Sequence, residues 1–165
     1  SVSQRMFEPY AESFGVVYPL QTLSKTMDFD AVKVPLCVES DCLGDNCDKV
    51  MRLVSELSAT HCEMSERQRA VAHLAAVFAC NFSNALYGMA DQLLQKEGFS
   101  LELLMPLMEQ TLEKLKTMSP EEAQTGPAAR HDTVVMGQQM MALDDERMRA
   151  IYAAISDYIM GRSAK

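Results

Sequence analysis

The sequence lacks the short motifs that identify the commonest nucleotide-binding and hydrolytic enzymes. Its seven glycines are scattered, so it contains neither a G-x-G-x-x-G dinucleotide fingerprint nor a P-loop. It also has no G-x-S-x-G nucleophile elbow. The usual sequence evidence for a bound nucleotide phosphate or a serine nucleophile is therefore absent from these 165 residues.

Positive charge is also scarce. Lys and Arg total 15 against 23 Asp and Glu, which gives a net charge of −8 and a pI of about 4.8. Such a surface repels phosphates, which argues against a nucleic acid or an anionic membrane as partner. The first residues are polar and mixed rather than signal-like, so we expect a cytoplasmic protein.

The five cysteines form no metal-binding pattern. Cys42 and Cys47 would point about 140° apart on a helix, and His61 and Cys62 would face opposite sides of a strand. Zinc needs converging ligands, so we predict no metal site. We expect reduced thiols that are mostly buried as small hydrophobic side chains.

The chain changes character near residue 64. Before it, strands are predicted at 16–18, 34–38 and 60–63, and Asp41 is predicted to cap a helix over 42–57. This order is typical of a parallel α/β unit. The apolar residues of the predicted helix are Val50, Met51, Leu53, Val54 and Leu57.

After residue 64, every segment is predicted to be helical. Ser65 opens a long helix that ends near Lys96, before Gly98. The other helices are predicted over 100–118 (with Pro106 kinking it or moving its start), from 119, over 132–143, and from 144 or 145 to 160. The fold class is therefore mainly α: a helical bundle on a long central helix, preceded by a partial α/β segment, with domains 1–63 and 64–165.

The long helix has no charged residue between Ala70 and Ala90, a length that can span a bilayer. It contains several polar residues, however, and the mean hydropathy of the chain is only −0.09. We therefore expect no membrane span, and a helix buried in the centre of a bundle or of a dimer. Its predicted core stripe is Val71, Leu74, Phe78, Phe82, Ala85, Met89 and Leu93.

A polar stripe follows a second face of this helix. His73, Asn81 and Asn84 share that face with Val77 and Gly88, because the spacings are three or four residues. A buried polar group without a partner costs about 1–3 kcal/mol, so these groups must meet partners. They either bond to neighbouring helices and fix helix register, or hold a polar ligand against the helix, with Gly88 allowing close approach.

Two loops carry further candidate groups. Gln21 and Thr22 follow the first strand, and ligands of parallel α/β sheets bind beyond the carboxyl ends of strands. Residues 125–132 read Thr-Gly-Pro-Ala-Ala-Arg-His-Asp, a tight turn that can present Arg130 and Asp132 to a small polar ligand. The alternative is that Asp132 only caps the helix that follows, with its two neighbours in solvent.

Residues 18–22, 73–84 and 125–132, in this order, resemble the C-terminal portion of Rossmann-type NAD(P)-dependent oxidoreductases related to pyrroline-5-carboxylate reductase. The likeness is greatest to the branch whose C-terminal half is a helical domain of unassigned function. The resemblance covers essentially the whole chain and is carried by order and spacing. It implies a dinucleotide-binding domain, a helical domain that pairs with a second subunit, and a substrate cleft between them.

The resemblance implies roles for individual residues. Pro19 would lie near the nicotinamide of NADP or NAD, and His73 would donate a proton, because histidine titrates near neutral pH. Arg130 would pair with a carboxylate of a small substrate with a C=O or C=N group. The other substrate-binding residues would be Tyr18, Gln21, Thr22, Asn81, Asn84 and Asp132.

Two departures from the family pattern matter. The family usually has His where this chain has Tyr18, so the resemblance assigns Tyr18 no proton-relay role. The glycine-rich half is missing, so we expect residues 1–63 to be the tail of a Rossmann domain, and the chain to be a homodimer-forming fragment that is inactive alone. The alternatives are a non-catalytic helical interaction module and an independent small-molecule-binding protein.

Overall fold

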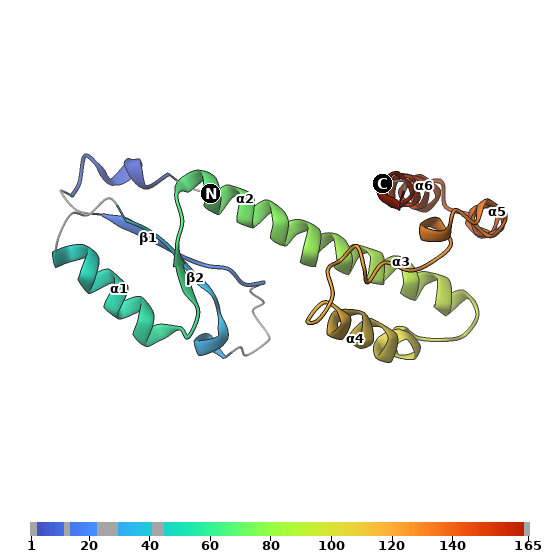
Figure 1. Cartoon of the computed structure of the whole chain (residues 1–165), viewed down its shortest axis with the longest axis horizontal. Helices are drawn as coiled ribbons and strands as arrows, with labels where there is room; N and C mark the ends of the chain where they lie inside the picture. Colours follow the sequence, from blue (N-terminus) through green and yellow to red (C-terminus); the bar gives the residue numbers. More distant parts are fainter. Residues whose placement is uncertain (1–2, 12–13, 23–29, 41–44, 164–165) are drawn as a thin grey trace. The chain divides into compact units, whose positions relative to one another are not determined.

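The computed structural model describes residues 3–11, 14–22, 30–40 and 45–163, and it is mainly helical with a small sheet near the N-terminus (Figure 1). The predicted fold class is confirmed. A partial α/β segment comes first in the chain, the long helix follows it, and shorter helices make up the rest. Contacts divide the chain into two compact units, Ser1–Leu86 and Tyr87–Lys165. The assignment of 1–63 and 64–165 to separate domains stays a prediction.

The sheet of the first unit contains β1 (Gly15–Pro19), β2 (Leu36–Ser40) and β3 (His61–Glu63), in that order. β1 pairs with β2 antiparallel, whereas β2 and β3 are parallel and are joined through α1 (Asp45–Leu57). The predicted parallel unit is thus confirmed for β2, α1 and β3. The predicted cap of this helix, Asp41, lies outside the described residues.

One face of this sheet packs against α1. The buried cluster between them consists of Val34, Leu36, Val38 and Val54, with Val50 and Met51 partly buried against it. The prediction that Leu53 and Leu57 join this core is wrong, because their exposed fractions are 54% and 50%. Val54 is the fully buried residue of the helix, and the sheet that it packs against contains only three strands in the described residues.

The other face carries the residues of β2 that alternate with this core, and Glu39 among them anchors helix α2 (Glu66–Ala76). Its Oε2 accepts a hydrogen bond from Nη2 of Arg69 at 2.6 Å, and its Oε1 accepts one from the backbone N–H of Glu66 at 2.8 Å. The side chains of Arg69 and Glu39 are only 3% and 12% exposed. Since His73 follows Arg69 by four residues, the ion pair also places the next turn of the helix above the sheet.

The long helix forms as predicted, over Glu66–Lys96. α2 passes into a π-helical segment, Val77–Phe82, and then into α3 (Ser83–Lys96). Ser65 and Gln68 close a capping box at its start. Gly98, with φ of 80°, follows its end.

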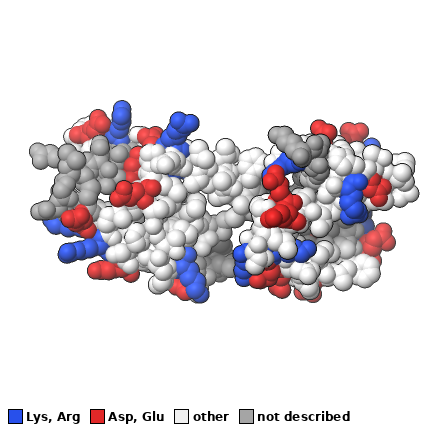
Figure 2. All heavy atoms as spheres, in the orientation of Figure 1, with Lys and Arg blue, Asp and Glu red and all other residues white. Residues whose placement is uncertain are grey.

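The long helix is not buried in a bundle within the single chain, and its predicted burial in the centre of a dimer stays a prediction. None of the most apolar part of this helix is buried inside the chain. By its length and composition alone the helix could cross a membrane, but a single helix of this kind is weak evidence for a membrane protein. Figure 2 shows a stretch without charged side chains along this helix, in agreement with the uncharged residues 70–90. The large apolar side chains exposed along it are Val71, Leu74, Phe78, Phe82, Leu86 and Leu93.

The second unit contains short helices. They are a 3-10 turn at Leu101–Leu104, α4 (Met105–Lys114), a 3-10 turn at Ala128–Arg130, α5 (Thr133–Ala142) and α6 (Glu146–Ser163). Pro106 moves the start of α4, because proline fits the first turn of a helix and no later position.

Three predicted boundaries in this unit are wrong. α4 ends at Lys114 rather than near residue 118. The segment after Ser119 is a turn, in which the side chain of Glu122 accepts the backbone N–H of Ser119 at 2.9 Å. α6 continues through Gly161, because a single glycine weakens a helix without ending it.

Candidate functional site

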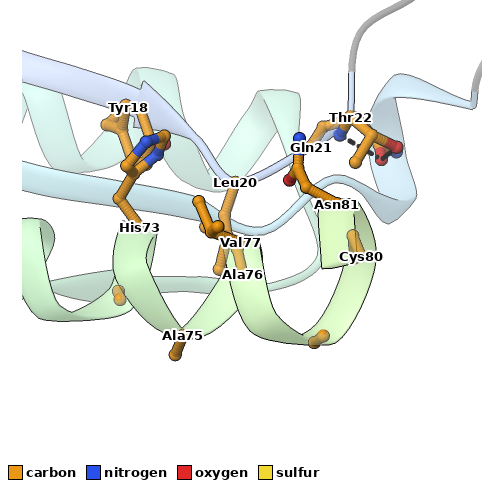
Figure 3. A pocket seen from close by; sticks show the side chains of 12 residues that line it. Tyr18, Leu20, Gln21, Thr22, His73, Ala75, Ala76, Val77, Cys80 and Asn81 are labelled. Carbon is orange, nitrogen blue, oxygen red and sulfur yellow. Dashed lines mark hydrogen bonds between the residues drawn. The ribbon is translucent and has the colours of Figure 1, made fainter. Parts of the chain in front are cut away.

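A cavity of about 730 Å³ lies in the first unit, between the end of β1 and the helical segment 72–81 (Figure 3). Five residues that the sequence singled out line it: Tyr18, Gln21, Thr22, His73 and Asn81. The other lining residues are small or apolar: Leu20, Ala72, Ala75, Ala76, Val77, Ala79 and Cys80. None of these described residues carries a formal charge apart from the titratable imidazole, so the site offers hydrogen bonds on an apolar wall.

Tyr18 and His73 meet at one end of this cavity. The Tyr18 hydroxyl lies 2.9 Å from Nδ1 of His73, and the two rings make an edge contact with centroids 6.4 Å apart. Tyr18 faces this helix because it pairs in register with Cys37 and shares a face of the sheet with that residue. The hydrogen bond thus joins residues 55 positions apart in the sequence.

Amide and hydroxyl groups lie toward the other end, where Figure 3 shows Gln21, Thr22 and Asn81. The Oε1 atom of Gln21 accepts the backbone N–H of Thr22 at 2.8 Å, which fixes the loop directly after β1. Asn81 belongs to the π-helical segment, a feature that is frequent at functional sites. Together these groups can bind a carbonyl, an amide or a hydroxyl of a ligand.

Two residues predicted for this site do not line the cavity. Pro19 is the last residue of β1, is exposed, and pairs in register with Leu36. Asn84 is exposed in the first turn of α3, beyond the π-helical segment, which disrupts the uniform α-helical spacing assumed for the polar stripe. His73, Asn81 and Asn84 are all exposed in this single chain, so their predicted burial could come only from a second copy and stays a prediction.

The Thr125–Asp132 segment belongs to the second unit and forms a tight turn. Gly126 has φ of 105°, and His131 adopts the left-handed conformation with φ of 54°. Oδ1 of Asp132 accepts the backbone N–H of Val135 at 3.1 Å, so Asp132 caps α5. Arg130 and His131 are exposed. The substrate contacts assigned to Arg130 and Asp132 stay predictions.

The thiols are less buried than expected. Cys37 is buried, whereas Cys62 and Cys80 are exposed, and all three are free. Burial, and then the neighbouring Cys62 thiol, raise the pKa of Cys37. Cys80 lines the cavity, a place that no sequence motif indicated, although the four alanines beside it show that this side of the helix allows close approach. Among the residues that the structure describes, no cluster of His, Cys, Asp or Glu could hold a metal ion.

A second cavity of about 490 Å³ lies between α5 and α6. Met136 and Met140 line it and are half-buried. Tyr152 also lines it and donates a hydrogen bond to Gln139 at 2.6 Å. Its walls carry few polar groups, so it lacks the convergent donors and acceptors of the first cavity.

Comparison with known proteins places the chain among proteins of related sequence and fold. The profile of the family "Domain of unknown function (DUF2520)" matches residues 34–159. A crystal structure of a Bacteroides fragilis "putative NADP oxidoreductase" is 34% identical, with a TM-score of 0.90 over 98% of this chain and 62% of that one. A Thermotoga maritima protein is 21% identical and shares the fold, with a TM-score of 0.76 over 99% of this chain and 66% of its own. No curated protein matches the chain.

Proposed function

This chain belongs to the family of the domain of unknown function DUF2520, and we propose that it is the substrate-binding and dimerisation part of an NADP-dependent oxidoreductase. The reaction moves a hydride between the nicotinamide and a small compound with a C=O or C=N group. The chain spans 62% of the Bacteroides fragilis protein, and the nucleotide-binding part is proposed to lie outside the residues printed here.

The cavity carries this proposal. Its polar groups converge from a strand end, a loop and a helix onto an otherwise apolar wall, which is the usual composition of a small-molecule site. His73 would give a proton to the oxygen or nitrogen of the acceptor, and its position in the wall of the cavity supports this role. Gln21, Thr22 and Asn81 would orient the acceptor, and a bound nicotinamide would supply the hydride.

A kinship with pyrroline-5-carboxylate reductase is part of the same proposal. The order of the segments 18–22, 73–84 and 125–132 supports it. In such an arrangement Asn84, Arg130 and Asp132 contact the substrate in the assembled protein, and Pro19 lies near the nicotinamide.

The exposed apolar face of the long helix supports the dimer. Phe78 and Phe82 are 63% and 50% exposed, and their rings pack edge to face with centroids 5.0 Å apart. Complete burial of a large apolar side chain contributes about 1.5–3 kcal/mol, so covering the exposed half of each contributes about 1 kcal/mol. A second copy can cover this face with its own equivalent face, as twofold symmetry requires.

Two substitutions test the enzyme against the interaction module. His73→Ala and Asn81→Ala in the full-length gene product should abolish NADPH oxidation with carbonyl and imine compounds, while circular dichroism and dimer mass stay unchanged. If the variants lose only stability and keep turnover, the polar groups serve packing and the reaction takes place elsewhere. A wild type that oxidises no NADPH with these compounds would contradict the enzyme proposal.

A third substitution tests the dimer. Phe78→Arg should give a monomer in sedimentation, whereas Val134→Arg, at a 69% exposed position on α5, should not. A dimer that persists in the Phe78 variant would remove this face from the interface.

A further inference from the structure

Tyr18 forms a hydrogen bond with one of the two ring nitrogens of His73. The Tyr18 hydroxyl lies 2.9 Å from Nδ1, so one of the two groups donates and the other accepts. Among the described residues, no hydrogen bond engages Nε2 of His73. The imidazole therefore has one nitrogen held by the protein and one left for a reactant.

The direction of this hydrogen bond follows from elementary chemistry. A phenol carries one proton and is a good donor, and the unprotonated nitrogen of a neutral imidazole is a stronger acceptor than a phenol oxygen. Tyr18 therefore donates to Nδ1, which leaves the imidazole proton on Nε2. In the opposite arrangement, the Tyr18 proton would have no acceptor among the described residues.

We infer that Tyr18 is a positioning residue that holds His73 in the tautomer with its proton on Nε2, the nitrogen that faces the acceptor in the proposed reaction. This inference rests on the proposed function for its catalytic meaning, although the tautomer itself does not. Tyr18 and His73 come from β1 and α2, and the Glu39–Arg69 ion pair holds α2 one helical turn before His73.

The tautomer gives the proposed reduction a complete proton path. A bound NADPH would supply the hydride for the new C–H bond, and the Nε2 proton of His73 would pass to the oxygen or nitrogen of the acceptor. The hydroxyl proton of Tyr18 would pass to Nδ1, so the imidazole would remain neutral. Water would then protonate Nε2 while the Nδ1 proton returns to the Tyr18 phenolate, which restores the phenol and the starting tautomer and leaves hydroxide. The path runs in the favourable direction because a phenol is a much stronger acid than the alcohol or amine that is formed.

The experiment measures the tautomer by nitrogen-15 NMR of the full-length gene product with labelled histidine rings, at a pH where the rings are neutral. His61, which is exposed, is the internal reference, and His73→Gln assigns the signal. In the wild type, the ratio of Nδ1–H to Nε2–H should be about fivefold lower for His73 than for His61, the effect of a hydrogen bond worth about 1 kcal/mol.

Tyr18→Phe should bring the two ratios together, because it removes only the hydroxyl. Tyr10→Phe, at an 85% exposed tyrosine, is the matched control and should change nothing. Equal ratios in the wild type, or a His73 ratio that Tyr18→Phe leaves unchanged, would overturn the inference. If the tautomer behaves as expected but the wild type has no NADPH turnover, the positioning stands and the proposed function fails. If His73→Ala leaves turnover intact, His73 is not the proton donor and the catalytic meaning of the inference is overturned.

Discussion

The ion pair between Glu39 and Arg69 gives the most quantitative prediction of this structure. Glu39→Gln keeps the size of the side chain and an acceptor for the backbone N–H of Glu66, but it removes the charge 2.6 Å from the guanidinium of Arg69. Because the Arg69 side chain is only 3% exposed, water cannot replace that charge. The variant thus removes the Glu39 carboxylate from contact with a buried cation.

The magnitude follows from this burial. Removing one partner of a buried ion pair costs about 3–5 kcal/mol. The amide that remains can still accept a hydrogen bond, so we expect a loss at the lower end, about 3 kcal/mol. This is a large part of the 5–15 kcal/mol that is typical of a folded domain. The loss should be concentrated in the first unit, where both residues lie.

The assay is urea unfolding followed by circular dichroism, with hydrogen exchange of the α2 amides as a local probe. Glu63→Gln, at an exposed carboxylate on the neighbouring strand, is the control and should change stability by less than about 0.5 kcal/mol. If Glu39→Gln costs no more than Glu63→Gln, water reaches Arg69, and the account of how α2 is held over the sheet is wrong.

Further predictions concern His131 and the neighbouring free thiols of Cys37 and Cys62. His131→Gly should raise stability by about 0.5–1 kcal/mol in thermal unfolding, because glycine adopts the φ of 54° without the steric cost of a Cβ, and His131→Ala should give no such gain. Alkylation followed by peptide mass spectrometry should modify Cys62 much faster than Cys37, which is 1% exposed; equal rates would contradict its burial. Because the pKa of Cys37 is raised in the folded state, its contribution to stability is present below the ordinary thiol pKa of about 8.5 and is lost as the pH rises. Cys37→Ala should therefore weaken the fall in stability at alkaline pH.

Local features of the fold could be predicted from the sequence. Ser65 and Gly98 marked the ends of the long helix correctly, because capping and left-handed conformations depend on neighbours in the chain. The strands were found for the same reason, through short β-branched runs that end at proline or polar residues. The segment from Ser119 was predicted to be a helix, but the structure shows a turn there. A capping pattern starts a helix only if the residues that follow continue it.

The surroundings of the helix could not be predicted in this way. Periodicity identifies an apolar face but not what covers it, so Phe78 and Phe82 were placed in a core that this chain does not supply. The π-helical segment also lay outside the α-helical spacing used for the polar stripe, which explains why Asn84 is separate from Asn81. Neither feature has a signal in a single sequence.

The candidate site was predicted in part. Tyr18, Gln21 and Thr22 were selected as a loop after a strand, and His73 and Asn81 as polar residues on an apolar helix. That these groups line one cavity depends on how α2 crosses the sheet, which local patterns do not encode. The hydrogen bond between Tyr18 and His73 is the clearest case, since 55 residues separate the two.

The central claim, that this cavity receives the nicotinamide and the acceptor, is tested most directly by titrating the full-length gene product with two cofactor forms. NADP⁺ carries the nicotinamide ring, whereas 2′-phospho-ADP-ribose is the same molecule without it. If the nicotinamide binds in this cavity, the ring signals of His73 in the NMR spectrum should shift with NADP⁺ and not with 2′-phospho-ADP-ribose, while those of His61 should respond to neither. A His73 signal that both ligands move equally, or that saturating NADP⁺ leaves in place, would contradict it.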